Sequence, residues 1–88
     1  MTFDLVYHLR FSKSAEVLSH KHLAKLGVLI ERLREDPYDP LLHTKHLSEP
    51  FIGMLSFRIS RDWRVAFKFL DDKTIQLIRV KHRKDIYR

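Results

Sequence analysis

Apolar and polar residues alternate along two segments in the second half of the chain, one over 54–60 and one over 64–70. Because successive side chains of a strand point to opposite faces, each segment predicts a β-strand with one apolar face. The opposite face carries Arg58, Arg64 and Lys68, so we expect it to be basic. The residues of the predicted apolar face are Leu55, Phe57, Ile59, Val65, Phe67 and Phe69.

A helical pattern occupies the first half. Apolar residues recur every three or four positions from about 12 to 35, which predicts an amphipathic helix. Ser12 or Ser14 can cap its start. A break near 19–21 would divide it into a short helix and a longer one. The sequence Asp36–Pro40 ends the longer helix, because a proline disfavours helical backbone at the residue before it.

Two more strands complete the prediction. Residues 3–9 are rich in β-formers and predict a first strand, while 74–80 predict a last strand after a hairpin turn at 71–73. Leu77 and Ile78 are adjacent and both apolar, which indicates a strand that is buried on both faces and central in its sheet. The order of elements predicts an α+β fold. It consists of an N-terminal strand and a two-helix hairpin packed on a curled antiparallel sheet of about four strands, followed by a short C-terminal tail.

Length and composition indicate one domain over residues 1–88, with 44% hydrophobic residues and no cysteine. Disulfides and thiolate zinc sites are therefore excluded. His20 and His22 are poorly spaced for a shared metal and no carboxylate cluster supports them, so we expect neither a metal nor another cofactor. No apolar run reaches the roughly 20 residues of a membrane span. The first residues lack the build of a secretory signal, and we expect a cytoplasmic protein without a membrane partner.

The net charge of +6 is unevenly distributed. Residues 1–44 contain 6 Lys/Arg and 6 Asp/Glu, whereas residues 45–88 contain 11 Lys/Arg and 5 Asp/Glu. All of the excess positive charge therefore belongs to the second half. Such an asymmetry indicates a polyanionic partner for one part of the domain.

Residues 82–87, His-Arg-Lys-Asp-Ile-Tyr, follow the last predicted strand and combine an imidazole, two cations and a phenol. Arginine can hold a phosphate with paired donors, and histidine transfers protons near neutral pH. We therefore expect RNA chemistry, with these groups and the basic sheet face meeting at one pocket.

Segments 56–67, 75–80 and 82–87 together resemble the RelE/ParE toxin superfamily of bacterial and archaeal toxin–antitoxin systems. The resemblance covers the whole chain, and the predicted order of elements is also the layout of that superfamily. It implies the toxin of a type II system. In one branch, RelE-like toxins cleave mRNA in the ribosomal A site. In another, ParE-like toxins inhibit DNA gyrase and lack the cleavage residues.

For the RelE-like branch, the resemblance implies a set of catalytic residues and a metal-independent endoribonuclease. Attack of the RNA 2′-OH on the scissile phosphate would leave a 2′,3′-cyclic phosphate. We expect His82 to act as general acid or base, Arg64 and Arg83 to hold the phosphate, Arg58 to stabilise charge and Tyr87 to stack on a base.

The match at the C-terminal arginine is uncertain in register between Lys81 and Arg83. Ser56 departs from the pattern, because RelE itself has a lysine there. Other cations are expected to contact RNA or the ribosome: Lys45, Arg61, Lys68, Lys81 and Lys84.

Simpler explanations stand beside this hypothesis. His82 can be an ordinary surface histidine, Arg64 can pair with Asp62 or Asp85, and Ile86 can merely dock the tail. The chain can also be a ParE-like gyrase inhibitor or an inactive binding module of the same fold. Either toxin function implies a cognate antitoxin whose acidic segment wraps the basic face, for example in a heterotetramer, besides the ribosome and mRNA.

Overall fold

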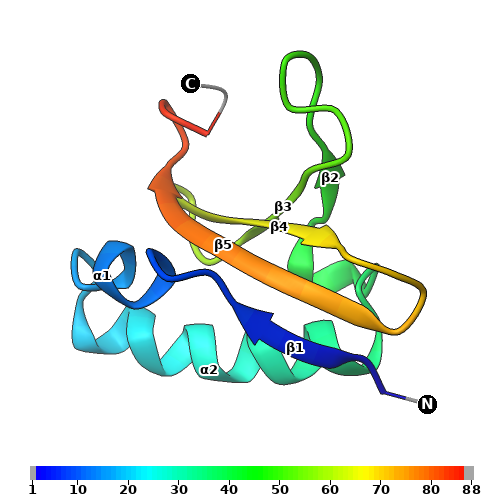
Figure 1. The fold of residues 1–88 in the computed structure, drawn as a ribbon. Helices are drawn as coiled ribbons and strands as arrows, with labels where there is room; N and C mark the ends of the chain where they lie inside the picture. The colour runs from blue at the N-terminus through cyan, green and yellow to red at the C-terminus, as the bar shows by residue number, and fades with distance from the viewer. Residues whose placement is uncertain (1, 87–88) are drawn as a thin grey trace.

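The computed structural model describes residues 2–86, and two helices and a sheet form the domain (Figure 1). The predicted elements are all present, with shifted ends. The sheet also contains a strand of two residues, β2, that was not predicted. The elements are β1 (Asp4–Tyr7), α1 (Phe11–Ala15), α2 (His20–Glu35), the 3-10 turn η1 (Pro40–Leu42), β2 (Lys45–His46), β3 (Leu55–Arg58), β4 (Trp63–Phe69) and β5 (Thr74–His82).

The five strands form one mixed sheet in the order β1-β5-β4-β3-β2. The prediction of an antiparallel sheet of about four strands therefore needs two corrections. β1 runs parallel to β5, and β2 adds a fifth strand at the other edge. A parallel pair has to be joined by a long crossover, and here the crossover includes both helices, which lie on one face of the sheet. As predicted, β5 has a neighbouring strand on each side.

The break between the helices covers residues 16–19, so it overlaps the predicted 19–21 at Ser19 only. Ser19 is the N-cap of α2, and its side chain accepts a hydrogen bond from the backbone N–H of His22. The predicted caps of the first helix are wrong, because α1 begins at Phe11 after an Arg10 N-cap without a side-chain bond. Ser14 instead links α1 to the sheet. Its hydroxyl accepts from the backbone N–H of Val80 at 2.8 Å and donates to the carbonyl of Phe11 at 2.8 Å.

The main core lies between α2 and the sheet. Residues at helical spacing on α2 are buried, and they pack against the predicted apolar face of β3 and β4. Phe57 and Phe67 are both fully buried there, with ring centroids 5.9 Å apart. The alternating pattern therefore correctly identified the core face. Its buried residues are Phe11, Ala15, Leu18, Leu26, Leu29, Leu33, Leu42, Leu55, Phe57, Ile59, Val65, Phe67, Ile75, Leu77 and Val80.

A β-bulge in β5 explains the adjacent apolar residues that complicated the sequence pattern. Ala66 of β4 is opposite Arg79, but the next residue of β4 is opposite Leu77, so Ile78 is left without a partner. A bulge inserts one residue and shifts the alternation of the strand. As a result, Leu77 and Val80 both lie in the main core, while Ile78 packs in a second, smaller cluster.

The β4–β5 turn is held by Asp71, whose carboxylate accepts a 2.8 Å hydrogen bond from the backbone N–H of Lys73. This bond, with a further one from the Thr74 side chain, lowers the pKa of the Asp71 carboxyl below its ordinary value. Because the charged form is favoured in the folded state, this contribution to stability is present above the unfolded pKa and is lost as the pH falls through the folded pKa.

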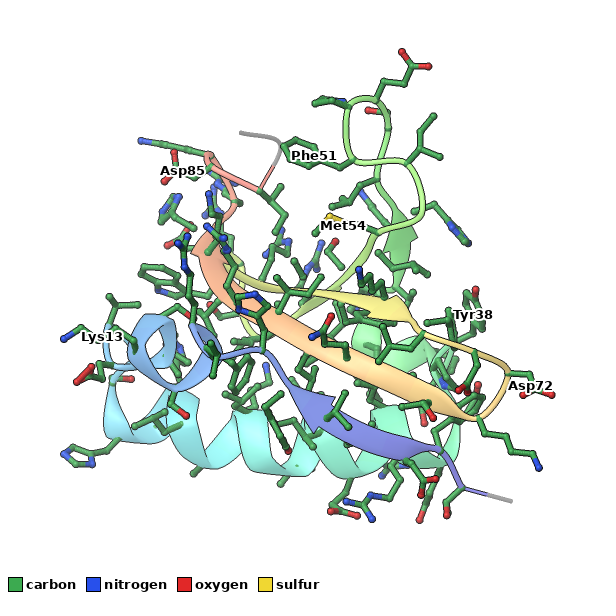
Figure 2. All side chains as sticks on the ribbon, in the orientation of Figure 1. Lys13, Tyr38, Phe51, Met54, Asp72 and Asp85 are labelled. Atoms are coloured by element: carbon green, nitrogen blue, oxygen red, sulfur yellow. The ribbon has the colours of Figure 1, made fainter. Side chains whose placement is uncertain are left out.

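The sheet face opposite α2 is flanked by two projecting segments, the loop between β2 and β3 and the turn after β5 (Figure 1). Phe51 extends from the loop toward the C-terminal turn, and Met54 lies below it, closer to the sheet (Figure 2). Ile86 from the turn is 7% exposed and forms the second cluster with Leu47 and Ala66. Ile86 thus docks the tail onto the domain, which was one of the alternatives for this residue.

Candidate phosphate-binding site on the open sheet face

Three cations form a row across the open face of the sheet. The register places Arg58 opposite Arg64, and Arg64 opposite Lys81. Directly paired residues of antiparallel strands share a face, with Cβ atoms roughly 5 Å apart. The predicted basic face is therefore confirmed, and β5 extends it by Lys81. Like charges at this spacing repel each other, so an anion bound over the row would be stabilised.

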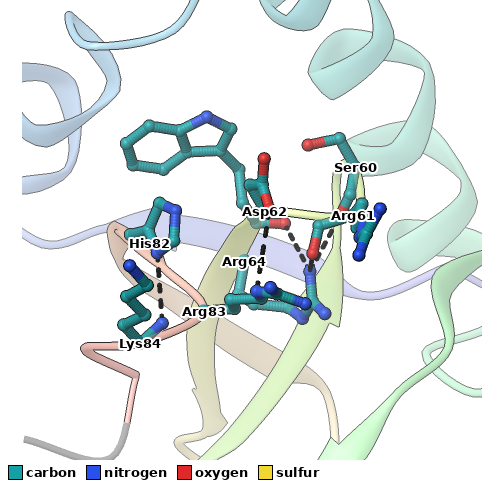
Figure 3. Close-up of polar contacts among 8 residues, drawn as sticks. Ser60, Arg61, Asp62, Arg64, His82, Arg83 and Lys84 are labelled. Carbon is teal, nitrogen blue, oxygen red and sulfur yellow. Dashed lines mark hydrogen bonds and ion pairs between the residues drawn. The ribbon is translucent and has the colours of Figure 1, made fainter.

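Arg64 also holds the turn between β3 and β4. Its Nη1 donates to the backbone carbonyls of Ser60 at 2.6 Å, Arg61 at 3.0 Å and Trp63 at 3.2 Å (Figure 3). Arg64 therefore fixes the turn that precedes β4, next to the cation row. The residue pattern did not predict this role.

Arg83 reaches the same turn from the end of β5. Its Nε lies 3.6 Å from Oδ1 of Asp62, and its backbone N–H donates to the Asp62 carbonyl at 2.7 Å (Figure 3). The predicted phosphate ligands Arg64 and Arg83 are thus both attached to residues 60–63. Asp62 thus forms an ion pair with Arg83. Because both side chains are about half exposed, this ion pair contributes little to the stability of the fold.

Arg58, a member of the row, has a buried nitrogen, Nε, that lacks a hydrogen-bond partner within the described residues. A buried donor without a partner costs about 1–3 kcal/mol. A phosphate oxygen would supply the missing acceptor, which agrees with the charge-stabilising role expected for Arg58.

A cavity of about 680 Å³ lies over the same sheet face, between the β2–β3 loop and the C-terminal turn. Two predicted RNA-binding residues, Lys68 and Lys81, line it, together with Arg79. Among the described residues, none of those lining it is acidic. The lining residues are His8, Phe51, Ile52, Gly53, Met54, Ala66, Lys68, Phe69, Gln76, Ile78, Arg79, Lys81 and Ile86.

His82 lies on the other side of the strand end. It is opposite Trp63, and the two rings make an edge contact with centroids 5.2 Å apart. It lines a separate depression of about 450 Å³ with Lys81 and Asp85. The expectation that all catalytic groups share one pocket is therefore not met. Lys81 lines both hollows and connects them at the end of β5.

The contacts of His82 determine which of its nitrogens is available. Its Nδ1 accepts a hydrogen bond from the backbone N–H of Lys84 at 3.2 Å (Figure 3). Nδ1 therefore carries a lone pair, and the proton of the neutral ring is on Nε2. In this arrangement the imidazole is a hydrogen-bond donor at Nε2. Each of the two roles expected for His82, general acid or general base, requires another protonation state of the ring, whereas donation of a hydrogen bond from Nε2 fits this geometry directly.

The remaining predicted residues are dispersed. Lys45 is exposed in β2 and faces the same side as Ser56, the buried residue opposite it. Arg61 and Lys84 are exposed in turns, and their backbone atoms make the contacts described above. Tyr87 lies outside the described residues.

The structure also identifies two polar residues at the cavity that the sequence analysis missed, Gln76 and Arg79. Arg79 escaped notice because the bulge at Ile78 disrupts the alternation by which the basic face was recognised. Gln76 carries no charge. Its position could have indicated that it lies in the sheet, because Gln76 is two residues before Ile78 on a strand that was predicted to be central.

Residues 2–86 contain no group of three or more His, Asp or Glu side chains arranged to hold a metal ion. No helix in this part of the chain has both the length and the apolar character to cross a membrane.

Comparison with solved structures shows similarity over nearly the entire chain. YafQ from E. coli strain BL21(DE3) has a TM-score of 0.79 at 22% identity, covering 98% of this chain and 99% of YafQ. A YoeB/ParE toxin from Agrobacterium tumefaciens has a TM-score of 0.77 at 18% identity, with 92% and 99% covered. In the archaeal RelE–RelB complex from Pyrococcus horikoshii OT3, the matched chain has a TM-score of 0.77 at 21% identity, with 97% and 99% covered.

No protein-family model and no curated protein sequence matches the chain. The structural similarity therefore establishes the fold, at identities too low to transfer an activity. The chain has the fold that these YafQ, YoeB/ParE and RelE toxins share, as the resemblance implied.

Proposed function

We propose that this protein is the toxin of a type II toxin–antitoxin pair and that it cleaves mRNA bound in the ribosomal A site without a metal ion. The row of Arg58, Arg64 and Lys81 beside a cavity without acidic lining residues is the observation that carries the proposal. A fold shared with YafQ, YoeB/ParE and RelE proteins supports it.

The proposed reaction takes place at the end of β5. The scissile phosphate lies over the cation row, where Arg58 and Arg64 stabilise the charge that develops as the 2′-oxygen attacks phosphorus. The bond from phosphorus to the 5′-oxygen breaks, leaving a 2′,3′-cyclic phosphate. The proton of the 2′-hydroxyl passes to water, and a water molecule protonates the departing 5′-oxygen. His82 donates a hydrogen bond from Nε2 to that oxygen, in agreement with its contact to Lys84. Lys81, which lines both hollows, bridges the phosphate and the imidazole.

An antitoxin partner follows from the same surface. Cations around a partly apolar cavity suit an acidic segment, which would cover the phosphate site and block RNA. RelE and RelB form a complex in the Pyrococcus horikoshii structure. For this chain we propose an acidic antitoxin that occupies the open sheet face, in a complex such as a heterotetramer.

The decisive experiment is primer extension on mRNA from programmed ribosomes incubated with purified protein. The proposal requires discrete breaks within codons and a cyclic phosphate on the 5′ fragment. His82→Ala removes a hydrogen-bond donor to the developing oxyanion and should lower the rate by about 10²- to 10³-fold. Cleavage at the original rate would remove His82 from the mechanism. Intact mRNA together with accumulated cleaved DNA–gyrase complexes would replace the ribonuclease proposal with gyrase inhibition.

A further inference from the structure

The cavity over the sheet has the size and composition of a small-molecule site. Its volume of about 680 Å³ lies within the range of ligand pockets, roughly 300–1,000 Å³. About half of the wall is apolar, and Phe51 contributes an aromatic ring to this part. The cations Lys68, Arg79 and Lys81 contribute to the polar half. A fitting occupant therefore has a flat apolar part and carries negative charge, as a nucleotide does.

Gln76 supplies a neutral polar group among the apolar side chains and cations of the cavity. It is half-buried, and within residues 2–86 it is the only carboxamide that lines the cavity. Its side chain forms no hydrogen bond in this part of the structure. A carboxamide carries two donor hydrogens and one acceptor oxygen, so Gln76 can make paired bonds to a ligand that presents both types of group.

The position of Gln76 relates it to the cation row. Gln76 is opposite Lys68 in the β4–β5 ladder, and Lys68 is four residues along β4 from Arg64. At the rise of a strand these four residues span roughly 13 Å. Neighbouring nucleotides of one stacked strand are roughly 3.4 Å apart along its axis, and farther apart when the strand is unstacked. A phosphate over Arg64 and a base beside Gln76 can therefore belong to one short stretch of RNA.

These observations favour a nucleobase over an acidic peptide as the occupant. Carboxylates of a peptide would be satisfied by the cations alone and would leave the Gln76 amide without a partner. An unstacked RNA base uses every part of the site, because its ring packs on apolar side chains while its edge exchanges hydrogen bonds with polar groups. Lys68, opposite Gln76, can contact the adjoining phosphate.

We infer that this cavity holds one base of the mRNA codon and that Gln76 reads its edge, which makes Gln76 a determinant of codon preference. This inference rests on the proposed ribonuclease function. Adenine is the favoured base, because glutamine can bind two adjacent groups of its edge at once. A paired contact of this kind discriminates between bases on the order of tenfold or more.

The test uses the full chain with Gln76→Leu, which keeps the approximate size and removes the amide, and Gln76→Glu, which replaces the amide donors by a carboxylate oxygen. Asp72→Asn is the matched control, since Asp72 lies exposed in the β4–β5 turn outside the cavity (Figure 2). Circular dichroism confirms that each variant is folded. Primer extension on programmed ribosomes then gives the base frequency at each codon position of the cleaved sites.

We expect wild type and Asp72→Asn to share a preference for adenine at one codon position. Gln76→Leu should reduce that preference about tenfold while it still cleaves. The same preference in wild type and Gln76→Leu would overturn the inference and leave the ribonuclease proposal intact. Loss of antitoxin affinity in Gln76→Leu without any change in base preference would also overturn it, and would assign the cavity to the peptide.

A ribosome-free measurement separates this inference from the proposed function. AMP, GMP, CMP and UMP are titrated into the protein while amide chemical shifts are followed. Tighter binding of AMP, with shifts at Gln76 and Ile78 that are lost in Gln76→Leu, supports the base site even if the protein cleaves no mRNA. Equal shifts with all four nucleotides, or none, refute the base site whatever the result on ribosomes.

Discussion

Arg64 is expected to contribute to both folding and phosphate binding, whereas Arg58 contributes to phosphate binding alone. In Arg64→Ala, the carbonyls of Ser60, Arg61 and Trp63 lose a charged donor. A hydrogen bond to a charged group contributes about 1.5–3 kcal/mol. Nη1 has two hydrogens for three acceptors, and the site is partly exposed. The free energies of the three hydrogen bonds are therefore not additive. We expect a loss of about 2–3 kcal/mol in the free energy of unfolding.

A domain of this size has a total stability of about 5–15 kcal/mol, so this loss is large. Since 1 kcal/mol shifts the midpoint of such a domain by about 4–8 °C, the thermal midpoint of Arg64→Ala should fall by about 10–20 °C. Arg58→Ala is the matched control. Its Nε has no hydrogen-bond partner within residues 2–86, so it should lose no more than about 1 kcal/mol, from packing of its alkyl chain.

The assay is urea denaturation of both variants followed by circular dichroism, with cleavage measured at a temperature where both are folded. Both variants should cleave at least 100-fold more slowly than wild type, by analogy with the loss of one oxyanion donor. Only Arg64→Ala should have a lower denaturation midpoint. Equal midpoints would refute the structural role of Arg64. Full activity in Arg58→Ala would remove the buried guanidinium from the phosphate site.

Other predictions concern the core, the link between α1 and the sheet, and electrostatics. Phe57→Ala should destabilise the fully buried core by about 3–5 kcal/mol, measured by urea denaturation, and a loss below 1 kcal/mol would contradict the packing described. Ser14→Ala leaves the Val80 N–H without its acceptor and should cost about 1–3 kcal/mol by thermal melting, whereas the exposed Ser12→Ala should cost less than 0.5 kcal/mol, as roughly expected at a surface site. If three cations neutralise RNA phosphates, affinity for single-stranded RNA should fall roughly 20-fold between about 50 and 200 mM KCl, as fluorescence anisotropy would measure, and a salt-independent affinity would exclude the electrostatic part of the site.

The residue pattern was sufficient to predict which side chains share a face. Alternation along β3 and β4 placed Phe57, Val65 and Phe67 in the core, and it placed Arg58 and Arg64 together on the other face. This prediction succeeds because the two-residue period of a strand is local and depends on no distant contact. The break before α2 was predictable for a similar reason, since Ser19 caps the helix through residues that follow it closely.

The position of the imidazole could not be predicted in this way. The sequence placed His82 close to the cations, but its side is determined by the β4–β5 register, which pairs His82 with Trp63 and Lys81 with Arg64. A bulge at Ile78 lies between this end of β5 and the rest of the strand. A single inserted residue reverses every later side chain, so no count along the strand alone assigns the face.

By itself, then, the sequence determined the α+β class, the core face, the basic face and the concentration of positive charge in the second half of the chain. Only the tertiary structure decided that β1 runs parallel to β5, that Arg64 holds the 60–63 turn, and that Gln76 and Arg79 line one cavity with Phe51. The physical reason is one of range. Periodicity and capping act between near neighbours, whereas strand direction, register and cavities arise when segments far apart in the chain close on one another.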